Sequence, residues 1–367
     1  MRVPAVAAAV NLISSSIGTL PARIVRTDNG SKVVAEDHDA FRLVARFAND
    51  RVSAGKLRER LAMDALLHGN AYAYANRVGN RVVEIVRLDP ASVSLQLDPR
   101  TGEPIYRSTV DKHVFDPATL IHIPAPTSFD GVSGVSPIFL AKEAIGLALV
   151  MEARAAKLFG VSARPSGVIE VPQNVGEDAL KRMGAGWRAA HEGAENSGRT
   201  PILHDGASFK PMIFSSVDAQ FLEMRREQTL EIARAFGVPP TMIAELSAGT
   251  FANTEQQSLQ FIKHTLAPWL STFADELARA LLTDDERDTY AIEFDVDALI
   301  AIDTAARTDR IAKLRSAGVM TANDARAELG LPAHDEGDTL TSPHTTAGAA
   351  PSANEPPANP ESEDIAA

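Results

Sequence analysis

A compact segment of mixed α and β character, residues 165–214, lies between two long predicted helices. The first helix begins at Ser136-Pro137, a favourable N-cap followed by proline at the first helical position, and extends to about Phe159. The second covers about Asp218–Phe236 and is stopped by a Gly-Val-Pro-Pro sequence at residues 237–240. The chain must therefore leave a scaffold on one long helix, build a small domain and return on another.

Short strands dominate residues 1–135. Apolar side chains at helical spacing predict a first helix over residues 4–20, and a second is expected around Ser53–Leu67. Asp-Pro dipeptides beginning at residues 89, 98 and 116 mark connections between strands. The expected strands are Ala22–Arg26, Ala71–Arg77, Val82–Leu88, Val93–Leu97, Ile105–Val110 and Leu120–Ile123. Together with the helices they predict an α+β fold.

The remaining elements continue this mixture. Within the compact segment we expect a strand at Gly167–Val171, a helix at Glu177–His191 and a hairpin at Pro201–Phe214. A helix over about 254–282 should bend at Pro268. A strand at Tyr290–Val296 and helices at Ala305–Ala317 and Ala322–Leu329 complete the body. Beyond Asp335 the Pro-, Ser-, Thr-, Ala- and Glu-rich composition predicts disorder.

Composition and charge exclude several classes of protein. The chain has no cysteine, which excludes a disulfide framework, a thiolate metal site and a cysteine nucleophile. The formal net charge is −12. Residues 333–367 hold seven acids and no Lys or Arg, which leaves 41 acids against 36 bases before them, a net of −5. No run of basic residues marks a sequence-specific DNA-binding surface.

The apolar N-terminal stretch resembles an export signal at first sight. However, Val6, Val10, Ile13 and Ile17 recur at steps of three or four residues, which favours an amphipathic helix. An exported α/β binding protein is the alternative. No stretch reaches the ~20 apolar residues that a membrane span requires, so no membrane association is expected.

The search for enzyme motifs yields one candidate. No phosphate-binding loop is present, so the chain is not expected to be an ATPase. Asp295 and Asp297 alternate along a predicted strand and, with Asp303 beyond, could hold Mg²⁺ for a nucleotidyltransferase or nuclease. No phosphate cradle accompanies them, and turn or capping roles are favoured. We predict no enzyme activity, no cofactor and no metal site.

The second long helix carries a charged face. Glu223, Glu227 and Glu231 follow one another at i, i+4 spacing, with Arg225 and Arg226 elsewhere on the circumference. A solvated face is the ordinary interpretation. The alternatives are an acidic channel wall, or ion pairs with arginines of an adjacent subunit.

Five stretches together carry a resemblance to a family. They are Val6–Pro21, Leu66–Ala73 (LLHGNAYA), Asp130–Pro137 (DGVSGVSP), Ile232–Pro240 (IARAFGVPP) with the following FANTEQ and TLAP at residues 251–256 and 265–268, and Ala317–Arg326. In this order they resemble the portal proteins of long-tailed bacteriophages, prophages and gene-transfer particles. The chain departs from the family in its short N-terminus, and in having Asn323-Asp324 where Asn-Glu is commoner.

The resemblance implies an architecture. Its parts are a wing (1–135 and 257–297), stem helices (136–164 and 215–240), a clip (165–214), a tunnel loop (241–256), a crown (298–340) and a disordered tail (341–367). The tunnel-loop residues expected to face DNA are Ser247, Ala248, Gly249, Thr250, Phe251 and Asn253. This loop has no basic residue, which suits a conduit because each phosphate neutralised by Lys or Arg adds affinity.

The resemblance also implies a function. Such proteins form dodecameric rings at one capsid vertex, through which double-stranded DNA is packaged and ejected. The expected partners are further copies of the chain, non-specifically bound DNA, the terminase large subunit, the head–tail adaptor and the major capsid protein. The expected location is the virion, with the host cytoplasm during assembly.

Overall fold

The computed structural model describes residues 2–28, 31–79, 81–159, 167–172, 176–191, 206–211, 216–244, 254–296, 298 and 304–340. The chain divides into two compact units, residues 1–294 and 295–367, and each is described by itself. Helices and strands are mixed throughout, which confirms the predicted α+β class. The predicted tail at 341–367 lies outside the described residues.

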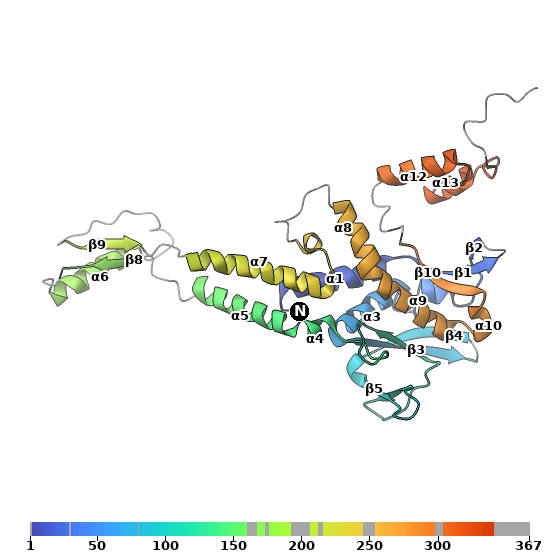
Figure 1. Ribbon diagram of the computed structural model, residues 1–367, viewed down its shortest axis with the longest axis horizontal. Coiled ribbons are helices and arrows are strands. Elements are labelled where there is room, and N and C mark those ends of the chain that lie inside the picture. Colours follow the sequence, from blue (N-terminus) through green and yellow to red (C-terminus); the bar gives the residue numbers. More distant parts are fainter. Residues whose placement is uncertain are drawn as a thin grey trace, which may run out of the picture. The chain divides into compact units, whose positions relative to one another are not determined.

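Two crossing helices form the centre of the first unit. Helix α1 (Pro4–Thr19) packs against α3 (Ala54–His68), which begins at the Ser53 N-cap (Figure 1). A Cβ atom on Gly55 would lie 2.5 Å from the carbonyl oxygen of Gly18, so the two backbones touch where the helices cross. This contact explains the glycine in the first family-like stretch.

A buried arginine joins three helices of this core. Arg58 of α3 donates from Nη1 to the carbonyl of Val44 (2.8 Å), in the short helix α2 (Phe41–Ala45), and from Nη2 to that of Leu20 (2.9 Å), which ends α1. Burial lowers the pKa of Arg58 to about 10, so the side chain is still protonated at neutral pH. Its positive charge therefore lies at the negative ends of two helices.

Strands far apart in the sequence make the sheets. Strand β1 (Ala22–Asp28) lies between β2 (Ser31–Val34) and β10 (Tyr290–Phe294), with Ile24 opposite Ile292. A second antiparallel sheet has β3 (Asn70–Val78) between β4 (Arg81–Leu88) and β7 (Leu120–Pro124). Strands β5 (Val93–Leu97) and β6 (Pro104–Ser108) form a separate pair behind the short 3-10 helix η1 (Pro90–Ser92).

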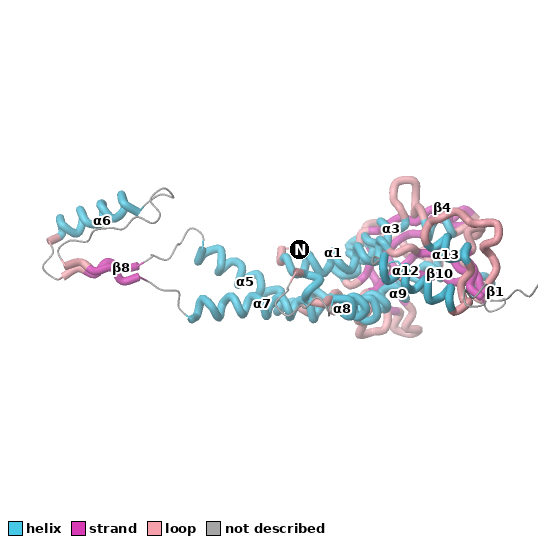
Figure 2. The backbone as a smooth tube through the Cα atoms, turned by 90° about the horizontal axis from the view of Figure 1, so that it is seen from above, coloured by secondary structure: helices cyan, strands magenta, loops and turns pink. Residues whose placement is uncertain are grey.

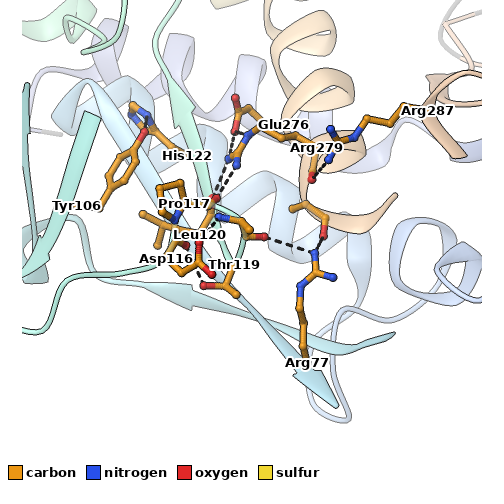
Figure 3. A network of polar contacts seen from close by, with 12 residues as sticks. Arg77, Tyr106, Asp116, Pro117, Thr119, Leu120, His122, Glu276, Arg279 and Arg287 are labelled. Atoms are coloured by element: carbon orange, nitrogen blue, oxygen red, sulfur yellow. Dashed lines mark hydrogen bonds and ion pairs between the residues drawn. The ribbon is translucent and has the colours of Figure 1, made fainter. Parts of the chain in front are cut away.

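Helix α9 (Ala267–Leu281) is fastened to the second sheet by arginines (Figure 3). Arg77 of β3 donates to the carbonyl of Ala280 (2.6 Å) near the end of α9. Arg279 reaches the carbonyl of Leu120 (2.8 Å), where β7 begins. Arg287, in the short helix α10 (Asp284–Arg287), donates to the carbonyl of Arg279 (2.8 Å). The last carbonyls of α9, which have no helical partner, are satisfied in this way.

The long helices differ from prediction in two places. The helix expected over 136–159 is interrupted at Ala141 (φ −95°, ψ 16°), which separates α4 (Pro137–Leu140) from α5 (Lys142–Phe159). In the helix predicted over 254–282, a π-helical segment (Phe261–Leu266) joins α8 (Thr254–Gln260) to α9 just before Pro268. Proline has no N–H for the carbonyl four residues earlier, and the wider π turn accommodates this loss upstream of the proline.

Helices α5 and α7 (Ser216–Phe236) lie side by side (Figures 1 and 2). Between them in sequence come β8 (Gly167–Glu170), α6 (Glu177–His191) and β9 (Ser208–Pro211). Helix α6 has the bounds predicted from the sequence. Of the hairpin predicted at Pro201–Phe214, residues 201–205 and 212–214 lie outside the described residues. Strand β9 pairs antiparallel with β8. The rings of Trp187 and Phe209 stack at 5.3 Å between α6 and this pair.

The second unit contains α12 (Thr304–Ser316) and α13 (Ala322–Glu328). Asn323 closes the segment after α13, because its side chain donates to the carbonyl of His334 (2.9 Å) and accepts from the His334 N–H (2.7 Å). Asp324 completes a capping box with Thr321. The departure from the family pattern at Asp324 therefore preserves the cap.

Candidate channel and assembly site

Helix α7 presents all five predicted charged residues to solvent. The side chains of Glu223, Arg225, Arg226, Glu227 and Glu231 are exposed. Within the same helix, Glu227 forms an ion pair with Arg234 at 2.9 Å, and Gln228 donates to Glu231 at 3.1 Å. Two of the three glutamates thus have partners in their own chain. The structure supports the ordinary interpretation of a solvated face and leaves a channel or subunit contact as a proposal.

The opposite face of α7 is packed inward. Ile232, Ala233 and Phe236 are buried, and so is the polar Gln228. Helices α1, α4 and α5 contact α7, with Arg154 of α5 lying over the ring of Phe221 at 6.0 Å. A cavity of about 130 Å³ remains between the start of α1 and the two long helices. One face of α7 is therefore packed against other helices of the chain, while its charged face is exposed to solvent.

Helix α5 exposes large apolar side chains that the sequence did not single out. Leu147, Leu149 and Val150 are 45%, 40% and 65% exposed, while Met151 and Ala155 face the interior. The preceding α4 exposes Phe139 and Leu140, and α7 exposes Met224. The available signal was apolar residues on more than one side of the helix. Helical spacing by itself does not tell which of these sides its own chain covers, so this surface was not predicted.

The structure brings two of the five family-like stretches together at the base of α4. Asn70, from LLHGNAYA, accepts from the backbone N–H of Gly134 (2.9 Å), from DGVSGVSP, and donates to its carbonyl (3.1 Å). Ser136 donates its hydroxyl to the carbonyl of Leu66 (2.8 Å) and also caps α4 by accepting from Ile138. We call these contacts of Leu66, Asn70, Gly134 and Ser136 the stem-base joint.

A buried histidine supports this joint. His122 Nε2 lies 2.8 Å from Asn70 Oδ1, and His122 Nδ1 lies 3.0 Å from the hydroxyl of Tyr106. Since the amide oxygen accepts, Nε2 is the donor and Nδ1 accepts from Tyr106, which is the neutral tautomer. Burial lowers the pKa of His122 to about 4, with Arg279 adding to the effect. The imidazole also stacks on Tyr72 at 5.0 Å.

Comparison with known proteins identifies the family. The model of the phage portal protein family matches residues 4–330. The probable portal protein of Streptomyces phage phiC31 is 30% identical over 315 residues, which cover 82% of this chain and 68% of that protein. This chain belongs to the phage portal protein family. The portal protein of Enterobacteria phage HK97 is 26% identical over 335 residues, covering 90% of this chain and 78% of that protein.

Solved structures agree with this membership of the portal family. A chain from the neck of an empty gene transfer agent particle, computed with C6 symmetry, has a TM-score of 0.67 at 27% identity and covers 89% of this chain and 90% of its own length. The HK97 family phage portal protein from Corynebacterium diphtheriae has a TM-score of 0.51 at 18% identity, covering 82% and 96%, and shows the shared fold alone. The predicted portal resemblance is confirmed.

Several predicted residues of this portal-family chain fall in ranges that the structure does not describe. Ser247, Ala248, Gly249, Thr250, Phe251 and Asn253 lie outside the described residues, as do Asp297 and Asp303 of the candidate metal site. Asp295 directly follows β10. Among the described residues, no group of three or more His, Asp or Glu side chains is arranged to hold a metal ion. The comparisons give the nuclease alternative no support.

No helix in the described part of the chain combines the length and the apolar character that crossing a bilayer demands.

Proposed function

We propose that this chain is the subunit of a closed portal ring, located at one vertex of a phage-like capsid, through which double-stranded DNA passes during packaging and ejection. Membership of the portal family supports the role. The observation that carries the ring is the exposed apolar surface of α5, formed by Leu147, Leu149 and Val150. Such a surface is suited to a heterologous contact between identical subunits, which closes into a ring.

The symmetry of a similar structure supports a proposal for the number of subunits. A gene transfer agent neck that contains a similar chain was computed with C12 symmetry, with a TM-score of 0.65 at 27% identity. We propose a dodecamer for this chain as well. Helices α4, α5 and α7 then form the stem, and β8, α6 and β9 form the clip.

Passage of DNA is supported by the charge of the stem. The three exposed glutamates of α7, Glu223, Glu227 and Glu231, offset the exposed Arg225, Arg226 and Arg234 of the same helix, so these side chains carry no net positive charge with which to retain phosphates. We propose that the ring is a conduit without enzyme activity. Its clip docks the terminase large subunit and the head–tail adaptor, its wing contacts the major capsid protein, and the tunnel loop at 241–256 contacts the duplex.

Replacement of Val150 by Glu tests the ring. A charge in the proposed subunit contact should prevent assembly because it would be desolvated there without a partner. Val78, at the end of β3, is 70% exposed against 65% for Val150, so Val78→Glu is the matched control. By native mass spectrometry and electron microscopy, wild type and Val78→Glu should form rings and Val150→Glu should remain a folded monomer. Normal rings from Val150→Glu would exclude α5 as the contact.

Deletion of residues 247–252 tests the tunnel loop. Rings should still form, while particles made with the variant should package or retain less DNA, measured as protected DNA per particle. Loss of rings would instead assign the loop a structural role.

A further inference from the structure

The stem-base joint depends on one side chain that imitates a peptide group. The Asn70 carboxamide pairs with both backbone polar groups of Gly134, accepting at 2.9 Å and donating at 3.1 Å. Two antiparallel backbone segments would exchange the same pair of bonds. The side chain of Asn70 therefore makes strand-like hydrogen bonds to Gly134, a loop residue that does not pair with the backbone of β3.

The two glycines at this contact, Gly69 and Gly134, have no room for a side chain. Gly69 has φ +87°, and a Cβ atom there would overlap the carbonyl oxygen of Gly134. A Cβ on Gly134 would overlap the backbone of both Gly69 and Ala125. The N–H of Ala125 also donates to the carbonyl of Gly69 at 2.7 Å. Because the backbones touch directly, the carboxamide has little freedom to adopt another arrangement.

The joint connects the end of one element to the start of the stem. Asn70 directly follows Gly69, the C-cap of α3, and begins β3. Gly134 stands two residues before Ser136, which caps α4 and donates to the carbonyl of Leu66 within α3. The direction in which α4 leaves the body is thus set by contacts to α3 and β3.

The carboxamide is itself held in place from the other side. Asn70 Oδ1 also accepts from His122 Nε2 at 2.8 Å, and His122 is held by the Tyr106 hydroxyl. Only an amide satisfies this arrangement, because it must accept from two N–H groups and donate to one carbonyl. An aspartate of the same shape could not donate to Gly134, and its oxygen would face the carbonyl oxygen there.

We propose that Asn70 is a positioning residue for ring assembly, which fixes the angle at which the stem leaves the wing. This inference rests on the proposed ring. In a closed ring every subunit repeats the same angle, so a small error in each copy accumulates around the circle and prevents closure. Asn70 acts through Gly134 and α4 rather than by touching a neighbouring subunit.

The substitution Asn70→Asp tests the proposal, with Asn76→Asp as control. Asn76 lies on the same strand and donates only to the Glu84 side chain, at 3.1 Å. In Asn70→Asp the carboxylate can still accept from the Gly134 N–H, and the bond that is lost is the one from Nδ2 to the Gly134 carbonyl. A net hydrogen bond is worth about a factor of ten in an equilibrium constant, so the open form of the joint, and with it amide exchange at Gly134, should increase by about that factor. Electron microscopy should show open or variable rings for Asn70→Asp and uniform closed rings for Asn76→Asp.

The outcomes separate the alternatives. Uniform rings of wild-type subunit number from a folded Asn70→Asp would overturn the proposal, even if its melting temperature fell. If Asn70→Asp does not fold, Asn70→Ser replaces it, since a hydroxyl is too short to span both backbone groups; uniform rings from that variant would overturn the proposal equally. Failure of the wild-type chain to form rings would refute the proposed function itself.

Discussion

Helices α3 and α5 have similar lengths but opposite relations to solvent. Helix α3 has 15 residues, of which eight are buried, including the charged Arg58 and Asp64. Arg87 of β4 forms a bidentate ion pair with Asp64, with N–O distances of 2.5 and 2.8 Å. Helix α5 has 18 residues, and among its described side chains only Met151 and Ala155 are buried.

The difference indicates which parts of the chain are complete in a single copy. Helix α3 has its apolar groups covered by its own chain, and its buried Arg58 and Asp64 both form hydrogen bonds within that chain. Helix α5 leaves leucine and valine side chains exposed, as the proposed contact between subunits requires. Substitutions should therefore affect folding on the α3 side and assembly on the α5 side.

The largest effect on folding is expected from Arg58→Met. The carbonyls of Leu20 and Val44 would lose their donors inside the core, at a cost of about 3 kcal/mol in the free energy of unfolding. Urea denaturation measures this change in the free energy of unfolding, with both proteins carrying Val150→Glu so that ring assembly does not contribute. Arg60, exposed on the same helix, is the control, and Arg60→Met should change stability by less than about 0.5 kcal/mol. Equal effects would show that α3 is less self-contained than its contacts indicate.

Acidification should weaken the same side of the molecule through His122. Its pKa in the folded chain is about 4, below the unfolded value of ~6.5. The unfolded chain therefore binds a proton first, so the contribution of His122 is complete above about pH 6.5 and declines as the pH falls towards 4. The total loss should approach about 3 kcal/mol.

Denaturation curves between pH 7 and 4 measure this decline. In His122→Gln the side chain cannot titrate, so the curve of stability against pH should be flatter than that of wild type. Parallel curves for the two proteins would show that other groups cause the acid sensitivity.

The smallest effect is expected on the charged face of α7. Glu227 and Arg234 are both more than half exposed, and pairs of this kind contribute at most about 0.5 kcal/mol. Glu227→Gln should leave monomer stability nearly unchanged, as judged by thermal unfolding in low and high salt. A loss above about 1 kcal/mol would place α7 with α3 as a helix stabilised mainly by its own chain.

Local signals in the sequence predicted much of the fold. The Ser136 cap and the bounds of α6 agree with the structure, because capping and helical periodicity act over a few residues. The pairing of β1 with β10 was not predictable, since it joins residues more than 260 positions apart. The interruption at Ala141 was not predictable either, since the residues on both sides of it, Leu140 and Lys142, are ordinary helix formers.

The candidate site was predictable only in part. Spacing alone gave the exposed glutamates of α7, because i, i+4 residues share a face. Spacing could not separate the apolar face of α5 that meets its own chain from the face that does not. The residues of the stem-base joint belong to two stretches that the sequence analysis had singled out. Their contact joins residues 64 positions apart, and neither stretch contains a signal that it packs against the other.

The arginines that hold α9 and α3 in place also influence how strongly the protein can bind a polyanion such as DNA. Arg58, Arg77, Arg279 and Arg287 donate to backbone carbonyls, and Arg87 is paired with Asp64. Phosphates would have to compete with these internal acceptors for the same N–H groups. The count of 36 Lys and Arg therefore overstates the cationic donors that the folded chain offers to nucleic acid. These five arginines serve the fold itself, which leaves a passing duplex with fewer places to be held.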